Sequence, residues 1–254
     1  MLGLGIASNS GLLADSASMS REAAFANTKS LDFDGTNDYV NTNYTATALF
    51  RGNFSFSYWV NLDAAICISI GVEKGTNSAF VIQHFSGKCN VFHYSNYAPG
   101  QPGLAGPSSD GTPFSLDTWH HVVWTVTKNP GSTTSYVLYL DGEAASTTLF
   151  AGLTVSEAYH NAFDSDGEFL AIGASNDDGT PDSFLNGHMD EVAVFDKALS
   201  SGEANAIYND GVPKDESGHD NLLLYYRFED DVTDTAGTSN ATNSGATFSS
   251  SVPS

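Results

Sequence analysis

Alternating apolar and polar side chains recur in short runs along this chain, and this period of two restricts its fold more than any other feature. In FSFSYWV (54–60), every second residue is large and apolar. WHHVVWTVT (119–127) alternates in the same way. Side chains two residues apart share one face of a β-strand, so both runs predict strands with one face toward a core.

Further runs of this kind predict a protein built almost entirely from strands. A meander is expected at 64–71, 79–84 and 89–94, and other strands at 29–34, 135–140, 169–173, 188–196 and 222–228. Asp141-Gly142 supplies the positive φ angles of a tight hairpin turn after 135–140. With 254 residues, 41% of them hydrophobic, the chain can form one large all-β domain. We expect its inner strands at 54–60, 119–127, 135–140 and 188–196.

One short helix is predicted after the run 188–196. Ser200 and Glu203 have the spacing of a capping box, in which each side chain bonds the other's backbone N–H. Ala204 and Ile207 follow at helical spacing, and Gly211 is placed to close the helix before Pro213.

The charge of the chain argues against two classes of partner. Its 30 acidic and 9 basic residues give a formal net charge of −21. Such a surface repels phosphate backbones, so we expect no nucleic-acid partner. No apolar run approaches the roughly 20 residues that a membrane helix needs, so we expect no membrane span. The acidity mainly favours solubility.

The two cysteines, Cys67 and Cys89, fall in the first and third strands of the predicted meander. With one strand between them they lie about 10 Å apart, which is twice the strand spacing. A disulfide needs Cα atoms closer than about 7 Å. We therefore expect two buried free thiols without a redox or zinc role.

Residues 1–28 are small, polar and aperiodic, and we expect them to form an arm separate from the domain at 29–254. Leu2, Leu4 and Ile6 are costly to leave in water, so the arm is expected to dock on a neighbouring copy or on a larger particle. The alternative is a frayed terminus. The start of the chain lacks the basic and apolar regions of a signal peptide, which predicts no export by the usual route.

Several stretches in order together resemble one known family. They are SLDFDGTNDYV (30–40), FSFSYWVNLD, TWHHVVWTVT with YLDGE, and FLAIGASNDDG with FLNGHMDEVAVFDKALSSGE and IYNDG. Their spacing over about 29–211 resembles the laminin-G-like, concanavalin A-like jelly-roll domains. The resemblance implies two antiparallel sheets face to face, with the helix as a plug against one edge. It also implies that LLLYYRF (222–228) is a permuted strand that closes the sheet from the other end of the chain.

Chains with a short Leu/Gly-rich start and one such domain resemble structural proteins of marine bacteriophages. This resemblance implies a virion surface protein, either a capsid decoration or a tail appendage, with a lectin-like domain for glycans. Its partners would be other virion proteins, copies of itself and cell-surface glycans. A virion protein assembles in the host cytoplasm and leaves by lysis, which agrees with the expected lack of an export signal.

The turn after strand 29–34 is the candidate metal site. It carries Asp34 and Asp38, and the resemblance places it near Asp190, where related jelly rolls hold a structural calcium. Hard oxygen ligands of this kind suit calcium. The alternative is that Asp38 and Asp190 only accept hydrogen bonds from turn amides. The sequence leaves both open.

Candidate glycan ligands lie in or beside two long loops, 95–118 and 154–167. Tyr94, Tyr97 and Tyr159 are aromatic residues that can stack on sugar faces, or that only pack as amphipathic residues do. Asp177 and Asp178 lie in a loop that resembles the ligand-carrying rim of calcium-dependent relatives, and the alternative is an acidic surface loop.

Glycoside hydrolases of the laminarinase type share this resemblance and are an alternative. They carry alternating carboxylates on one strand, with about 5 Å between a retaining pair. Here DEVAVFD (190–196) places Asp190 and Asp196 in phase with Val192 and Val194, which indicates a core face. We therefore predict no enzyme; a free carbohydrate-binding lectin is the other alternative to the virion protein.

Overall fold

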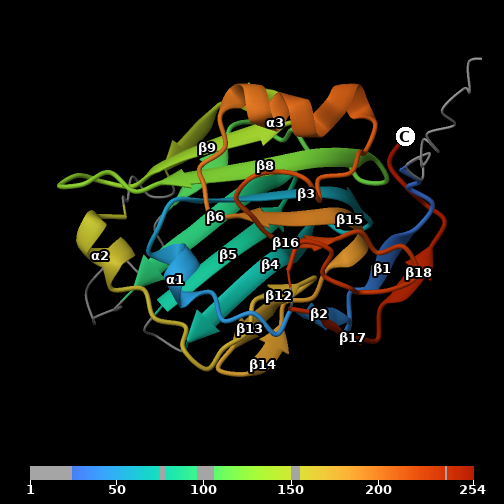
Figure 1. Ribbon diagram of the computed structural model, residues 1–254, viewed down its shortest axis with the longest axis horizontal. Helices are drawn as coiled ribbons and strands as arrows, with labels where there is room; N and C mark the ends of the chain where they lie inside the picture. Colours follow the sequence, from blue (N-terminus) through green and yellow to red (C-terminus); the bar gives the residue numbers. More distant parts are fainter. Residues whose placement is uncertain (1–24, 75–77, 96–105, 150–154, 238) are drawn as a thin grey trace, which may run out of the picture.

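The computed structural model describes the chain, apart from the side chains of 94, 95, 159 and 160, over residues 25–74, 78–95, 106–149, 155–237 and 239–254. Within these residues, an eight-stranded sheet and a ten-stranded sheet pack face to face (Figure 1). Almost all neighbouring strands run antiparallel. The predicted two-sheet jelly-roll sandwich is confirmed.

The eight-stranded sheet contains all four predicted inner strands, as β3, β8, β9 and β15. Its strands, in spatial order, are β10 (Glu143–Ala145), β9 (Ser135–Leu140), β8 (Trp119–Thr127), β3 (Phe54–Leu62), β15 (Asn186–Phe195), β1 (Ser30–Asp34) and β18 (Thr247–Ser249), with β16 (Leu222–Tyr226) also beside β15. Asp141 and Gly142 have φ angles of 50° and 80°, so the predicted hairpin turn joins β9 to β10.

The ten-stranded sheet is centred on the predicted meander, which forms β4, β5 and β6. Its strands, in spatial order, are β11 (Thr147–Leu149), β7 (Pro107–Ser109), β6 (Lys88–Ser95), β5 (Ser78–Phe85), β4 (Ile66–Lys74), β12 (Ala171–Ile172), β2 (Tyr39–Asn41) and β17 (Thr242–Ser244). Off this path, β13 (Ser175–Asp177) pairs with β4, and β14 (Thr180–Asp182) pairs with β13.

Short helices connect these strands. They are α1 (Thr47–Phe50), α2 (Glu157–Asn161), α3 (Ser201–Tyr208) and the 3-10 turn η2 (Asn209–Gly211). None of the helices in the described part of the chain is long and apolar enough to cross a bilayer.

An aromatic cluster joins the two sheets in the core. The ring of Phe80, from β5, lies 4.8 Å from Phe50, 5.1 Å from Phe54 and 5.3 Å from Phe56, measured between centroids. All four side chains are fully buried. Because Phe54 and Phe56 come from β3 in the opposite sheet, these contacts bridge the sandwich.

The cysteines are placed as predicted. Cys67 of β4 and Cys89 of β6 are each in register with His84 of β5, and both are free and buried. Burial raises the pKa of each thiol to about 12 and lowers the pKa of His84 to about 3. The thiols and the imidazole are therefore neutral core groups near neutral pH.

The predicted helix forms, but its position and its end differ from the expectation. The capping box is present, with Ser200 Oγ accepting the Glu203 N–H at 3.3 Å and the Glu203 carboxylate accepting the Ser200 N–H at 2.9 Å. Helix α3 ends at Asn209, whose left-handed conformation takes the place expected for Gly211. It covers the outer face of the eight-stranded sheet rather than an edge (Figure 1), packing Ala204 and Ile207 with Val123, Phe195 and Tyr225.

Two late segments of the chain complete the sheets. Strand β16 pairs with the Val192–Phe195 half of β15, and β1 pairs with the other half, so the first five residues of 222–228 form a strand of the eight-stranded sheet. That this strand is permuted stays a prediction. After it, β17 pairs with β2 and β18 pairs with β1. The chain therefore crosses from one sheet to the other between β17 and β18 and adds one strand to each.

We expect Phe80→Ala to lower the free energy of unfolding by about 3–5 kcal/mol, because it removes the ring that contacts both sheets. Denaturant unfolding measures the loss. Phe85→Ala is the matched control, since Phe85 lies on the same strand and is 46% exposed; its effect should stay within about 0.5 kcal/mol. Equal losses for the two variants would contradict the proposed role of the aromatic cluster.

Candidate functional site

The outer face of the ten-stranded sheet carries a small apolar cluster of its own. Ile68, Ala79, Val81 and Phe92 pack together there, on β4, β5 and β6. They alternate with residues such as Phe80, Ile82 and Val91, which face the core. The meander is therefore apolar on both faces, which is unusual for a sheet whose outer face meets water alone.

Two adjoining hollows lie over this cluster and form one groove. Their volumes are about 320 Å³ and about 210 Å³, and both are bordered by Ile68, Gln83 and Ser183. The larger extends to Phe184, and the smaller to Phe92. The loop that carries Ser183 is held against β4, because the Ile68 N–H donates to the Ser183 carbonyl at 3.1 Å. We call this feature the groove.

Gln83 and Ser183 are the polar residues among those that border both parts of the groove, and Gln83 carries the larger polar group. Its side chain is partly exposed and makes no hydrogen bond to any residue that the structure describes. A primary amide both donates and accepts hydrogen bonds. Gln83 therefore offers a ligand both kinds of bond above an apolar floor.

One end of the groove is acidic. Glu73 borders the smaller hollow and accepts a hydrogen bond from Ser175 Oγ at 2.5 Å. Burial raises the pKa of the Glu73 carboxyl, the Ser175 bond opposes the rise, and the negative charges of Asp177 and Asp182 add to it. Glu73 is consequently the groove carboxyl most ready to hold a proton.

Asp177 and Asp178, predicted from sequence as ligands, lie at this acidic end. Asp177 ends β13 in register with Glu73 of β4. Asp178 and Gly179 have φ angles of 48° and 79° and form the turn to β14. Asp177 is therefore close to the groove, while Asp178 is an exposed turn residue.

The side chains of the three predicted tyrosines lie outside what the structure describes. Tyr97 lies outside the described residues altogether, and so do the side chains of Tyr94 and Tyr159. The backbone of Tyr94 is in register with Ala79 of the apolar cluster. Their stacking on a glycan stays a prediction.

The candidate metal residues are only partly brought together. Asp38 Oδ2 accepts the Asp34 N–H at 3.0 Å, and Asp34 Oδ1 accepts the Thr36 N–H at 2.8 Å, as in a capped turn. Asp34 is in register with Asn186 on β15. Asp190 lies four residues further along β15, roughly 13 Å away at the rise of a strand.

The expected calcium site shared with Asp190 therefore does not fit the register of β1 and β15. Among the described residues, no group of three or more His, Cys, Asp or Glu side chains is arranged to hold a metal ion. Calcium binding at the Asp34–Asp38 turn stays a prediction, without Asp190 as a ligand.

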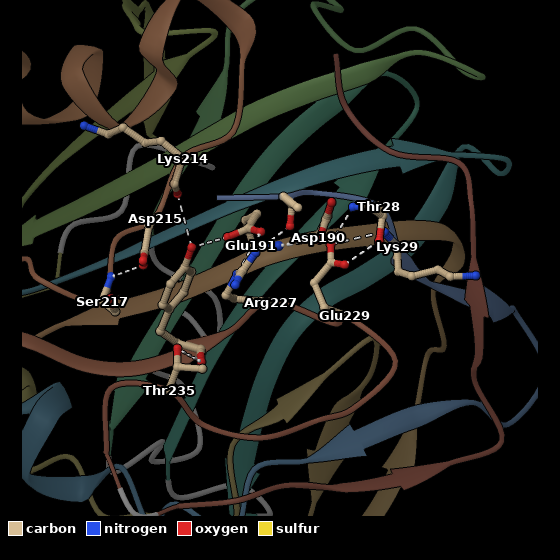
Figure 2. Close-up of polar contacts among 12 residues, drawn as sticks. Thr28, Lys29, Asp190, Glu191, Lys214, Asp215, Ser217, Arg227, Glu229 and Thr235 are labelled. Carbon is tan, nitrogen blue, oxygen red and sulfur yellow. Dashed lines mark hydrogen bonds and ion pairs between the residues drawn. The ribbon is translucent and has the colours of Figure 1, made fainter. Parts of the chain in front are cut away.

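A β-bulge within DEVAVFD (190–196) places Asp190 on a different face of the sheet from Val192 and Val194, so the predicted shared face is wrong for Asp190. The register of β15 with β3 shifts between Asp190 and Ala193, and Glu191 has a φ of 48°. Val192 and Val194 face the core as expected, but the extra residue turns Asp190 to the outer face, next to Glu191 (Figure 2). Asp190 is fully buried there and Asp196 is exposed, so the two form no catalytic pair.

Sequence reasoning missed the groove residues Glu73, Gln83 and Phe92. One signal pointed to them: in AFVIQHF (79–85), apolar residues occupy both phases of a period of two. That pattern indicates an outer face that is partly covered or used for binding.

Comparison with known proteins agrees with this architecture. The family model of the concanavalin A-like lectin/glucanases superfamily matches residues 34–205. No curated protein sequence matches the chain. Among solved structures, a Bacteroides ovatus protein provisionally described as carbohydrate-binding has a TM-score of 0.59 at 18% identity, covering 90% of this chain and 62% of that one.

Two further structures are similar over 70% of this chain. The CBM40 module of a Ruminococcus gnavus IT-sialidase, bound to α2,3-sialyllactose, has a TM-score of 0.52 at 14% identity, with 96% of that module covered. The NanB sialidase of Streptococcus pneumoniae has a TM-score of 0.51 at 16% identity, with 27% of it covered. At these identities the similarity shows the fold alone.

We expect Asp38→Ala to lower the free energy of unfolding by about 1–3 kcal/mol, because the Asp34 N–H loses its acceptor. Asp38→Asn is the matched control, since it keeps an acceptor oxygen and removes the charge. If Asp38 only caps the turn, the Asn variant should melt near the wild type, with or without calcium. A calcium-dependent rise in melting temperature that the Asn variant lacks would instead establish a calcium site.

Proposed function

The chain belongs to the concanavalin A-like lectin/glucanases superfamily, and we propose that it is a non-catalytic, glycan-binding protein of a bacteriophage virion surface. The groove on the ten-stranded sheet is the observation that carries the glycan-binding part. It combines an apolar floor, an amide without a hydrogen-bond partner among the described residues, and a carboxyl at one end.

A saccharide matches these groups chemically. A pyranose ring has an apolar face, which packs on aromatic and aliphatic side chains such as Phe92 and Ile68. Its hydroxyls donate and accept hydrogen bonds, as the Gln83 amide does. Two of the similar structures are described as binding carbohydrate, which supports the same ligand class.

The charge of the groove favours an uncharged saccharide or an amino sugar. Glu73 borders the groove, with Asp177 and Asp182 close to it, and none of the described residues that line it is basic. The whole chain carries a net charge of −21. A carboxylated or sulfated glycan would therefore be repelled.

Glycoside hydrolysis is the second candidate, and Glu73 is the observation that favours it. A half-buried carboxyl with a raised pKa beside other carboxylates resembles the pattern of a general acid. We place it second because the Ser175 hydroxyl already holds the Glu73 carboxylate. Release of reducing ends from a β-glucan by the wild type, abolished by Glu73→Gln, would favour the enzyme.

The proposed location on a virion rests on observations other than those for glycan binding. The Leu/Gly-rich start and the expected arm support it through their resemblance to phage structural proteins, and the acidic surface suits a particle that must stay dispersed. Its partners there would be other virion proteins and further copies of this chain. Mass spectrometry of purified particles tests the location, and a free lectin would be missing from them.

We expect Gln83→Ala and Phe92→Ala each to weaken glycan binding by about tenfold or more, since loss of a hydrogen bond or packed ring costs about 1.4 kcal/mol or more. Calorimetry against neutral oligosaccharides selected on a glycan array measures this. Val137→Ala is the control, because Val137 is 37% exposed on the other sheet. Wild-type affinity in both groove variants would remove the groove as the binding site.

We expect deletion of residues 1–24 to leave a folded domain that no longer enters particles. The described residues begin at 25, so every contact described among them is kept in the shortened chain. Circular dichroism checks the fold, and quantitative mass spectrometry of purified particles checks incorporation. Normal incorporation of the shortened chain would show that these residues have no docking role.

A further inference from the structure

The segment 25–29, which we call the strap, lies on the outer face of the eight-stranded sheet, held by two residues that follow β16. The Arg227 guanidinium lies 4.4 Å from the Phe25 ring centroid, and its Nη2 donates to the Ala26 carbonyl at 2.7 Å. Glu229 accepts the backbone N–H groups of Thr28 at 2.6 Å and Lys29 at 3.1 Å (Figure 2). The last residues of the predicted arm thus pack on the sandwich.

Beneath the strap lies the carboxyl pair that the β15 bulge creates. Asp190 is fully buried and Glu191 is 6% exposed. The Asn27 side chain of the strap lies against the Asp190 carboxyl. Figure 2 shows Arg227 beside Glu191, and Glu229 and Thr28 beside Asp190. The strap therefore covers two adjacent acids.

The polar groups beneath the strap are incompletely satisfied. Asp190 Oδ1 accepts the Glu191 N–H at 2.9 Å, and the Tyr225 hydroxyl donates to Glu191 Oε2. Asp190 Oδ2 and the Asn27 side chain are buried against each other without well-formed hydrogen bonds to the described residues. Polar atoms that are buried with incomplete hydrogen bonding weaken the docking of the strap.

More negative than positive side chains face Asp190 and Glu191. Glu229 faces both acids, and Asp215 faces Glu191. Arg227 is the cation facing the pair, with Nε 3.7 Å from Glu191 Oε1, while Lys29 points to Asp230 at 4.0 Å. Lys214, from the same loop as Asp215, reaches the site through its carbonyl, which accepts the Tyr225 hydroxyl at 3.2 Å.

Burial therefore keeps the pair neutral. It raises the pKa of Asp190 well above its usual range, and the neighbouring Glu191 raises it further. Burial also raises the pKa of Glu191 to about 8, against the opposing effects of the Tyr225 hydrogen bond and the Arg227 charge. Near neutral pH Glu191 therefore holds a proton for most of the time, and the raised pKa of Asp190 favours its neutral form as well.

We propose that the strap is released by deprotonation of the Asp190–Glu191 pair, so that it docks when the pair is neutral and leaves when the pair is charged. Two contacts give the cause. Ionised Glu191 attracts Arg227 away from Phe25 and Ala26. The new negative charges also repel Glu229, which holds the backbone of the strap.

The sign of the pH dependence follows from the raised pKa values. A group whose pKa is higher in the docked state favours docking fully below its ordinary pKa, and this contribution is lost as pH rises to the docked value. For Glu191 the window runs from 4.5 to about 8. Docking weakens by roughly tenfold per pH unit for each group within its window.

Hydrogen exchange of the full chain tests this proposal. The protection factor of backbone amides in the strap, which corrects for the intrinsic pH dependence of exchange, should fall roughly tenfold per unit between about pH 6 and about pH 8. Peptides from β3 and β8 should keep their protection. Asp190→Asn and Glu191→Gln, which mimic the neutral pair, should each flatten the fall.

Glu216→Gln is the matched control. Glu216 is a buried acid with a raised pKa that makes no contact with the strap among the described residues, so its variant should keep the wild-type fall. A second variant, Glu229→Gln, should loosen the strap at every pH without removing the dependence. Strap protection that is independent of pH in the wild type would overturn the proposal, as would an unchanged fall in folded Asp190→Asn and Glu191→Gln.

Discussion

Strand β15 is the element on which most of the sandwich depends, because it pairs with three strands from distant parts of the chain. It lies beside β3 along its length, and beside β1 and β16 on its other edge. Its inward residues Met189, Val192 and Val194 contribute to the main core. The β-bulge at Glu191 shifts the register between β15 and β3. It also places Asp190 and Glu191 side by side on the outer face, so the same irregularity that shapes β15 creates the buried acid pair beneath the strap.

The two outer faces of the sandwich have different surroundings. On the eight-stranded sheet, α3 and the strap cover the surface, and side chains such as Phe195 and Tyr225 are buried beneath them. On the ten-stranded sheet, the apolar side chains lie at the floor of the groove. This asymmetry leaves the groove open on one face, while the strap packs on the other.

Period-two alternation and local capping predicted the strands, the meander, the free thiols and the helix, because each depends on neighbours in sequence. The bulge was not predictable, since a single left-handed residue such as Glu191 reverses the phase without any mark in the pattern. Strands β17 and β18 were missed because their polar residues form an edge with little apolar content. The groove was not predictable because it depends on which strands become neighbours. The predicted calcium site that pairs Asp34 with Asp190 does not form because the register of β1 and β15 places Asp34 opposite Asn186.

The pairing of β17 with β2 and of β18 with β1 has a consequence for synthesis of the protein. Ser30 pairs with Ser249, and Asn41 with Thr242, so strands β1 and β2 remain incompletely paired until residues 242–249 have been made. Until then, each sheet exposes the unpaired N–H and C=O groups of an edge strand to other chains. The nascent chain can consequently pair with other chains at these edges until residues 242–249 are made, and such non-local pairing also slows its folding.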